Sequence, residues 1–203
     1  CGFLSLQPCD EDRTTGDFTI RGNNTFGQFA TDGNLTIREG KVTFENGLYV
    51  NGNLTIGNRN ISDREYDPDK YEDIEISGPI YVNGDLTIIG ADAKLNALIY
   101  VNGDVRRDPR DNTPSVRLRN SRINGLTKGG REGSLIIFAN KDIQISNNSV
   151  NQKKPSEIRG YFYSEDALEM FGVGSNLYIE GGLSARRVVL NAIRGRADSY
   201  RFD

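Results

Sequence analysis

The sequence contains no histidine and no tryptophan, and its 203 residues include two cysteines, one methionine and six prolines. Without histidine the chain cannot build a Ser-His-Asp or Cys-His catalytic site, or a histidine-ligated zinc site. No apolar run approaches the ~20 residues of a membrane-spanning helix, and no signal peptide is visible. An enzyme made from this chain would have to use carboxylates, arginine, lysine or tyrosine. The composition therefore favours a structural or binding protein that is not an enzyme and needs no cofactor or metal.

The net charge of −3 conceals an uneven distribution. Residues 1–100 carry 16 acidic and 8 basic side chains, whereas residues 101–203 carry 12 acidic and 17 basic side chains. Segments rich in charged side chains are most often solvated loops. The arginines are not interleaved with aromatic residues as in a nucleic-acid-binding surface, so we expect no nucleic-acid partner.

Internal repetition is the strongest signal in the sequence. Tyr49-Val-Asn-Gly-Asn-Leu-Thr-Ile56 returns as Tyr81-Val-Asn-Gly-Asp-Leu-Thr-Ile88 and, in part, as Tyr100-Val-Asn-Gly-Asp-Val105. We call this the Asn-Gly motif. Looser copies begin at Phe138, Tyr163 and Tyr178. An earlier relative of the motif, with one additional residue, spans residues 29–37.

Both flanks of the motif alternate between apolar and polar residues, as a strand with one buried face does. Asn-Gly is a strong hairpin signal, but a two-residue hairpin would place the apolar pairs on opposite faces. A three-residue turn keeps them on one face, so an antiparallel meander stays open. The alternative is a corner at which the chain bends and continues, with Gly52 inward and the asparagines hydrogen-bonded to one another in a ladder. Those asparagines are Asn51, Asn83, Asn102 and Asn140.

We favour the corner, and the predicted fold class is therefore all-β: a single-domain parallel β-solenoid (β-helix) with inserted loops, right-handed as parallel crossovers generally are. Residues 1–28 form an N-terminal cap segment and residues 29–203 the β-solenoid domain, with loop insertions near 57–73, 106–133 and 147–155. The one stretch with any helical character, residues 163–171, aligns with the repeat and is predicted as strand. Buried columns are expected to include Leu54, Ile56, Leu86, Ile88, Val101, Ile143 and Leu183.

The Asn-Gly motif, together with Gly160-Tyr-Phe-Tyr-Ser-Glu-Asp166 and Leu177-Tyr-Ile-Glu-Gly-Gly-Leu-Ser-Ala-Arg-Arg-Val-Val-Leu-Asn191, resembles β-solenoid ectodomains of bacterial surface and pilus-associated proteins. The sequence is similar in outline to minor pilins with an inserted β-solenoid, and more distantly to bactofilins. The resemblance covers about residues 29–195. The given sequence lacks the hydrophobic N-terminal helix of a pilin and the short regular repeats of bactofilins. The resemblance nevertheless has a clear implication. It implies an exported, non-enzymatic protein at a bacterial cell surface.

Cys1 and Cys9 bracket a short apolar segment near the start of the sequence. Two cysteines so close together favour a local disulfide in an oxidising compartment. A bond from Cys1 to a neighbouring subunit and a lipidated Cys1 stay open as alternatives.

Aromatic residues occupy one outward position in successive copies of the motif, and they are the candidate ligand-binding residues. An aromatic row of this kind has two interpretations: the rings pack against one another, or they form a stripe on which sugar rings stack. The candidates are Tyr49, Tyr81, Tyr100, Phe138, Tyr163 and Tyr178.

Carboxylates supply the remaining candidate chemistry. Asp85 and Asp104 each follow an Asn-Gly pair and have the oxygen ligands that Ca²⁺ prefers, although lone carboxylates at turns are more often solvated. No spacing singles out a carboxylate pair for glycoside cleavage. We therefore expect a non-enzymatic extracellular structural and adhesive module, pilus-associated or filament-forming; the alternative is a carbohydrate-active β-helix protein. Possible partners are a glycan or other cell-surface ligand and, through head-to-tail self-association, a second copy.

Overall fold

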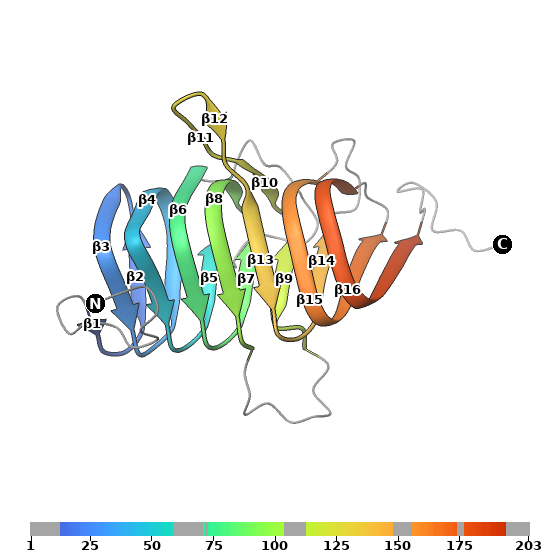
Figure 1. Ribbon diagram of the computed structural model, residues 1–203, viewed down its shortest axis with the longest axis horizontal. Helices are drawn as coiled ribbons and strands as arrows, with labels where there is room; N and C mark the ends of the chain where they lie inside the picture. The colour runs from blue at the N-terminus through green and yellow to red at the C-terminus, as the bar shows by residue number, and fades with distance from the viewer. Residues whose placement is uncertain are drawn as a thin grey trace.

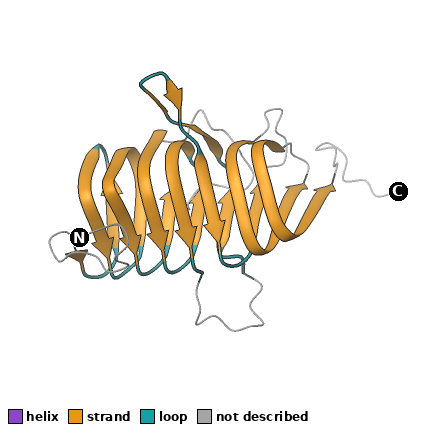
Figure 2. Cartoon of the chain, in the orientation of Figure 1, coloured by secondary structure: helices purple, strands orange, loops and turns teal. Residues whose placement is uncertain are grey.

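A computed structural model of the chain describes residues 13–58, 71, 73–103, 113–147, 156–173 and 177–193. Every regular element in these residues is a β-strand (Figure 2). The strands are β1 (Arg13–Thr14), β2 (Phe18–Arg21), β3 (Asn24–Thr31), β4 (Leu35–Val50), β5 (Leu54–Gly57), β6 (Asp73–Val82), β7 (Leu86–Ile89), β8 (Asp92–Val101), β9 (Val116–Arg119), β10 (Arg122–Gly125), β11 (Thr127–Lys128), β12 (Arg131–Glu132), β13 (Leu135–Ala139), β14 (Ile143–Asn147), β15 (Ser156–Val173) and β16 (Leu177–Ile193).

Copies of the Asn-Gly motif lie side by side in register. Leu54 pairs with Leu86, and Ile56 with Ile88, across the parallel strands β5 and β7. The same parallel arrangement holds throughout the 14-stranded main sheet, and the antiparallel pair in the described residues is the small hairpin β11–β12. The antiparallel meander is thereby excluded, and the all-β class with parallel strands is confirmed.

Groups of neighbouring strands form separate walls of the sheet. The two long strands β4 and β15 each belong to more than one wall. One wall contains β5, β7, β9 and β14, and another contains β6, β8 and β13. At one end β4 pairs with both β5 and β6, and at the other end β15 pairs with both β14 and β13. Strand β10 lies between β8 and β15. Figure 1 shows the bent strands stacked along the long axis of the molecule.

These pairings correct the predicted fold class. The sheet is a closed nine-strand parallel β-barrel, because the ladder from β4 through β5, β7, β9, β14, β15, β13, β8 and β6 returns to β4. The open, right-handed parallel β-solenoid is therefore not confirmed. The sequence did not reveal that β4 and β15, with 16 and 18 residues, each continue through corners and belong to more than one wall.

The predicted core is confirmed in its central part. Leu54, Ile56, Leu86, Ile88 and Ile143 are fully buried and Val101 is 2% exposed, whereas Leu183 is only partly buried against the core. One column runs from strand to strand through β2, β4, β5, β7, β9, β14, β15 and β16, so the apolar side chains stack upon their equivalents. Its members are Phe18, Leu35, Leu54, Leu86, Val116, Ile143, Leu168 and Val188.

The structure shows strands in parts of the segments that were predicted as an N-terminal cap and as loop insertions. Residues 13–28 of the predicted cap contribute β1, β2 and the first part of β3. The insertion predicted near 106–133 contains β9 to β12, and Val116, Leu118 and Ile123 are fully buried there. The central parts of the insertions near 57–73 and 147–155 lie outside the described residues. Residues 163–171 are strand within β15, as predicted.

Candidate functional site

Five of the six candidate aromatic residues form one row across the sheet. Tyr49 pairs with Tyr81, Tyr81 with Tyr100, Tyr100 with Phe138, and Phe138 with Tyr163, from β4, β6, β8, β13 and β15 in turn. We call these five residues the aromatic row. It ends on β16 at Ser184, which pairs with Tyr163.

Tyr178 does not belong to this row. It pairs with Glu157 near the start of β15, in a different wall from Tyr163. Its copy of the motif begins on β16 in another register, because Leu177–Gly181 pairs with the segment of β15 that precedes the row. The sequence similarity of Tyr178-Ile-Glu-Gly to the other motif starts was therefore misleading about position.

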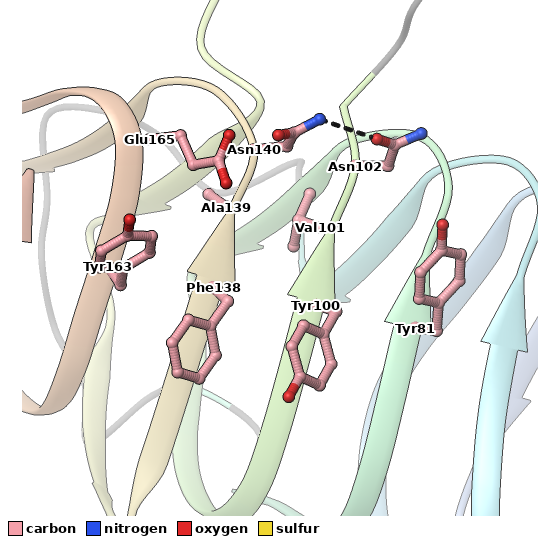
Figure 3. Close-up of a pocket in the computed structure, with 9 residues that line it drawn as sticks. All are labelled: Tyr81, Tyr100, Val101, Asn102, Phe138, Ala139, Asn140, Tyr163 and Glu165. Atoms are coloured by element: carbon pink, nitrogen blue, oxygen red, sulfur yellow. Dashed lines mark hydrogen bonds between the residues drawn. The ribbon is translucent and has the colours of Figure 1, made fainter. Parts of the chain in front are cut away.

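The rings of the row do not form one continuous stack. Tyr49 and Tyr81 stack with centroids 5.3 Å apart and an interplanar angle of 4°. Tyr100 and Phe138 form a second stacked pair at 5.4 Å and 15°, and the ring of Tyr163 is tilted by 49° relative to Phe138. Figure 3 shows the rings of Tyr81 and Tyr163 pointing toward the asparagine corner, whereas those of Tyr100 and Phe138 point away from it.

This alternation opens a shallow pocket of about 270 Å³ between the rings of Tyr81 and Tyr163, which we call the niche. Tyr100 and Phe138 border it on one side, and these residues are 42% and 38% exposed. Tyr81 and Tyr163 are three strand steps apart, or about 14 Å at the usual strand spacing. The niche is therefore wide enough for a flat ring system and open to solvent along its length. It is lined by Tyr81, Tyr100, Val101, Asn102, Phe138, Ala139, Asn140, Tyr163 and Glu165.

The asparagine side of the niche is held by the predicted ladder. The Asn83 side-chain amide donates to Oδ1 of Asn51 at 3.0 Å, and Asn102 donates to Oδ1 of Asn83 at 3.0 Å. Asn140 in turn donates to Oδ1 of Asn102 at 3.1 Å (Figure 3). Because each amide is oriented by its neighbour, Asn102 and Asn140 present fixed hydrogen-bonding groups to the niche.

The glycines of the Asn-Gly pairs let the corner pack closely enough for this ladder. A Cβ at Gly52 would lie 2.6 Å from the carbonyl oxygen of Gly33, and a Cβ at Gly84 would lie 2.5 Å from that of Gly52. The clash is with backbone, which cannot move aside as a flexible side chain can. The predicted need for glycine at this corner is therefore confirmed, and its cause is crowding between neighbouring strands.

Glu165 is the residue of the niche that the sequence did not identify. It lies at an irregularity in β15 between Ser164 and Ala167, where other copies have Asn-Gly. Ser164 Oγ donates to the carbonyl oxygen of Lys141 at 2.8 Å and accepts from the Asp166 N–H at 3.1 Å. These bonds fix the bend that places the exposed Glu165 beside the niche. The signal was the substitution of Glu-Asp for Asn-Gly at the corner.

The remaining candidates that the structure describes form no second site. The Asp85 N–H donates to Oδ1 of Asn53 at 2.8 Å, and no group of three potential metal-ligating side chains occurs within the described residues. Asp104, Cys1 and Cys9 lie outside those residues. Calcium binding by Asp85 and Asp104, the less favoured interpretation of these carboxylates, stays untested, and the Cys1–Cys9 disulfide stays a prediction.

Comparisons with known proteins add no identity. No protein family, curated protein or solved structure matches this chain significantly. None of the described segments is a helix with the length and apolarity needed to cross a membrane. The chemistry of the niche is therefore the main indication of function.

Proposed function

We propose that this chain is a non-enzymatic adhesive module that binds a saccharide in the niche. The observation that carries the proposal is the break in the aromatic row, which leaves Tyr81 and Tyr163 on either side of an open space bordered by Asn102, Asn140 and Glu165. Sugar rings have apolar C–H faces that pack on aromatic rings and hydroxyl groups that need fixed polar partners. The niche supplies both kinds of group, with amides that donate or accept and a carboxylate that accepts.

The stacked pairs within the row have a structural role. The ring faces of Tyr49 and Tyr81 cover each other, as do those of Tyr100 and Phe138. A ring in a stacked pair has one face covered by its neighbour, so it can contact a ligand only through the parts that line the niche. Ligand binding is therefore assigned to the niche and not to the full length of the row.

We place the module outside the cell, at a bacterial surface and in a pilus-associated or other structural setting. Support for this setting comes from the resemblance to surface and pilus-associated ectodomains in the Asn-Gly motif and in residues 160–166 and 177–191. A sheet of stacked parallel strands is rigid and would hold the niche at a fixed position relative to the rest of the sheet. Adhesion needs this kind of presentation.

The alternative is that the same niche cleaves its glycan. Glycoside hydrolysis uses two carboxylates on either side of the scissile bond, and Glu165 is the one carboxylate among the described residues that line the niche. Binding without turnover is the expected behaviour. Release of shorter sugars during incubation would instead favour the enzymatic alternative.

The test is a binding screen on a glycan panel that records retention and product release together. Tyr163→Ala is expected to weaken retention of a bound glycan roughly 2- to 10-fold, the contribution of one aromatic contact. Tyr178→Ala is the matched control, because Tyr178 is 52% exposed but lies outside the row. Equal losses from the two variants, or no retained glycan at all, would contradict the assignment of the niche.

A further inference from the structure

The last strand of the described sheet, β16, lies outside the closed ring of nine strands and leaves apolar side chains exposed at its edge. β16 pairs only with β15 among the described residues, and it lies at one end of the stack in Figure 1. Val188 and Leu190 continue the core columns of Leu168 and Met170, yet they are 45% and 65% exposed. Side chains in a core column are normally buried. The β16 edge therefore presents apolar side chains typical of a protein core at positions that are exposed to solvent.

The opposite end of the same columns lies on β2. Phe18 pairs with Leu35 and Ile20 with Ile37, at the start of the two columns that end at Val188 and Leu190. Phe18 is 38% exposed, whereas Ile20 is already buried. If a second copy continued the stack, its Phe18 would lie against Val188 and its Ile20 against Leu190. Both columns would then continue without a change of register.

The same register brings opposite charges together. Asp17 precedes Phe18 and Arg187 precedes Val188, and both side chains are exposed. The ends of the sequence follow the same trend: residues 1–20 carry four acidic side chains and one basic, and residues 184–203 carry five arginines and two aspartates. Two β16 edges would repel each other, whereas a β16 edge and a β2 edge attract.

We propose that β16 of one molecule pairs in parallel with β2 of a second copy, with Val188 against Phe18, Leu190 against Ile20 and Arg187 against Asp17. The contact is heterologous, so a pair of copies still presents one β2 edge and one β16 edge that are unpaired among the described residues, and the assembly grows into a filament unless it closes. Apolar contact and strand pairing hold the junction together, and the charge pair selects its direction.

The test is sedimentation velocity over a wide range of protein concentration, at low and high salt, with reductant present so that Cys1 and Cys9 cannot link copies. The wild-type chain should show a mass that rises with concentration, more steeply at low salt. Leu190→Asp should remove this rise. Asn191→Asp is the matched control, because it adds the same charge at an exposed position one residue further along β16. Circular dichroism confirms that each variant is folded.

A charge reversal tests the register itself. Arg187→Glu should weaken association about tenfold, the effect of about 1.4 kcal/mol, and combining it with Asp17→Arg in the same chain should restore it. A wild-type chain that stays monomeric at every concentration would overturn the proposal. Equal behaviour of Leu190→Asp and Asn191→Asp, or failure of the double reversal to restore association in a folded chain, would also overturn it.

Discussion

The two ends of the strand stack contain the same core columns but finish them differently. At the β2 end, Phe18, Phe26, Phe29 and Phe44 form an aromatic cluster with ring centroids 4.8–6.5 Å apart. Phe29 and Phe44 are nearly fully buried in it. At the β16 end the columns finish in Val188 and Leu190, which are exposed. Large aromatic side chains can cover the end of an apolar column, whereas aliphatic side chains leave the end to be covered by something else.

The largest expected effect compares the middle of one column with its β16 end. Leu86→Asp should abolish cooperative folding, because an unpaired carboxylate in the core costs several kcal/mol against a total stability of about 5–15 kcal/mol. Val188→Asp lies in the same column but is 45% exposed, and should cost about 1 kcal/mol. Urea unfolding followed by circular dichroism measures both. A cooperatively folded Leu86→Asp chain would contradict the assignment of this column to the core.

A second comparison sets the aromatic cluster against the open edge. Phe44→Ala should destabilise the chain by about 3–5 kcal/mol, since it removes a buried ring and leaves a cavity. Leu190→Ala should cost at most about 1 kcal/mol, because most of that side chain is already in water. Both are measured by urea unfolding at low protein concentration and high salt, where association is weakest. Similar losses for the two variants would show that the ends are equally well packed.

Glycine substitutions compare a corner inside the stack with a position on the edge strand. Gly52→Ala should cost about 1–3 kcal/mol, because its Cβ would meet the Gly33 carbonyl and the backbone must shift. Gly182→Ala on β16 should cost less, since its Cβ would meet the side chain of Tyr161 at 2.8 Å and that exposed ring can rotate away. Thermal unfolding ranks the two. The reverse ranking would contradict crowding as the reason for glycine at the corner.

The smallest effect concerns Asp17 at the β2 end. The pKa of Asp17 is lowered, first by the backbone N–H of Asn34 and second by the Asn34 side-chain amide. Because the folded pKa lies below the unfolded one, these bonds stabilise the fold above the unfolded pKa, and the gain is lost as the pH falls through the folded pKa. An NMR titration should find the Asp17 pKa raised only part of the way toward its ordinary value in Asn34→Ala, because the variant removes the side-chain amide and keeps the backbone N–H. Asn140→Ala, at a distant corner, should leave it unchanged.

The Asn-Gly motif was sufficient to predict parallel, in-register strands, the buried columns and the asparagine ladder. Each depends on local alternation and on a corner that only glycine can fill, and both are visible in sequence. β9 and β10 were missed, because Arg117, Arg119 and Arg122 alternate with Val116, Leu118 and Ile123 in a segment that has the composition of a polar loop. Those arginines lie on the outward side of strands whose apolar residues are fully buried.

The closure of the sheet and the position of Tyr178 could not be predicted for a different reason. Both depend on how far a strand continues beyond a corner, and β4, β15 and β16 continue through corners without a sequence break. The niche could be predicted from the sequence in part, since the aromatic row and the asparagines were predicted. The ring directions and the bend at Glu165 depend on tertiary packing.

The direction of the interstrand hydrogen bonds has a mechanical consequence. The strands run across the long axis of the molecule (Figure 1). The hydrogen bonds between neighbouring strands therefore lie roughly parallel to that axis. Tension applied between β2 and β16 would load these bonds in line, and they would break one strand at a time instead of resisting together in shear. β16 has a neighbour on one side only among the described residues, so it should peel away first. Under load, the molecule would extend stepwise at low force from its β16 end, dissipating energy strand by strand before the aromatic cluster at the β2 end gives way.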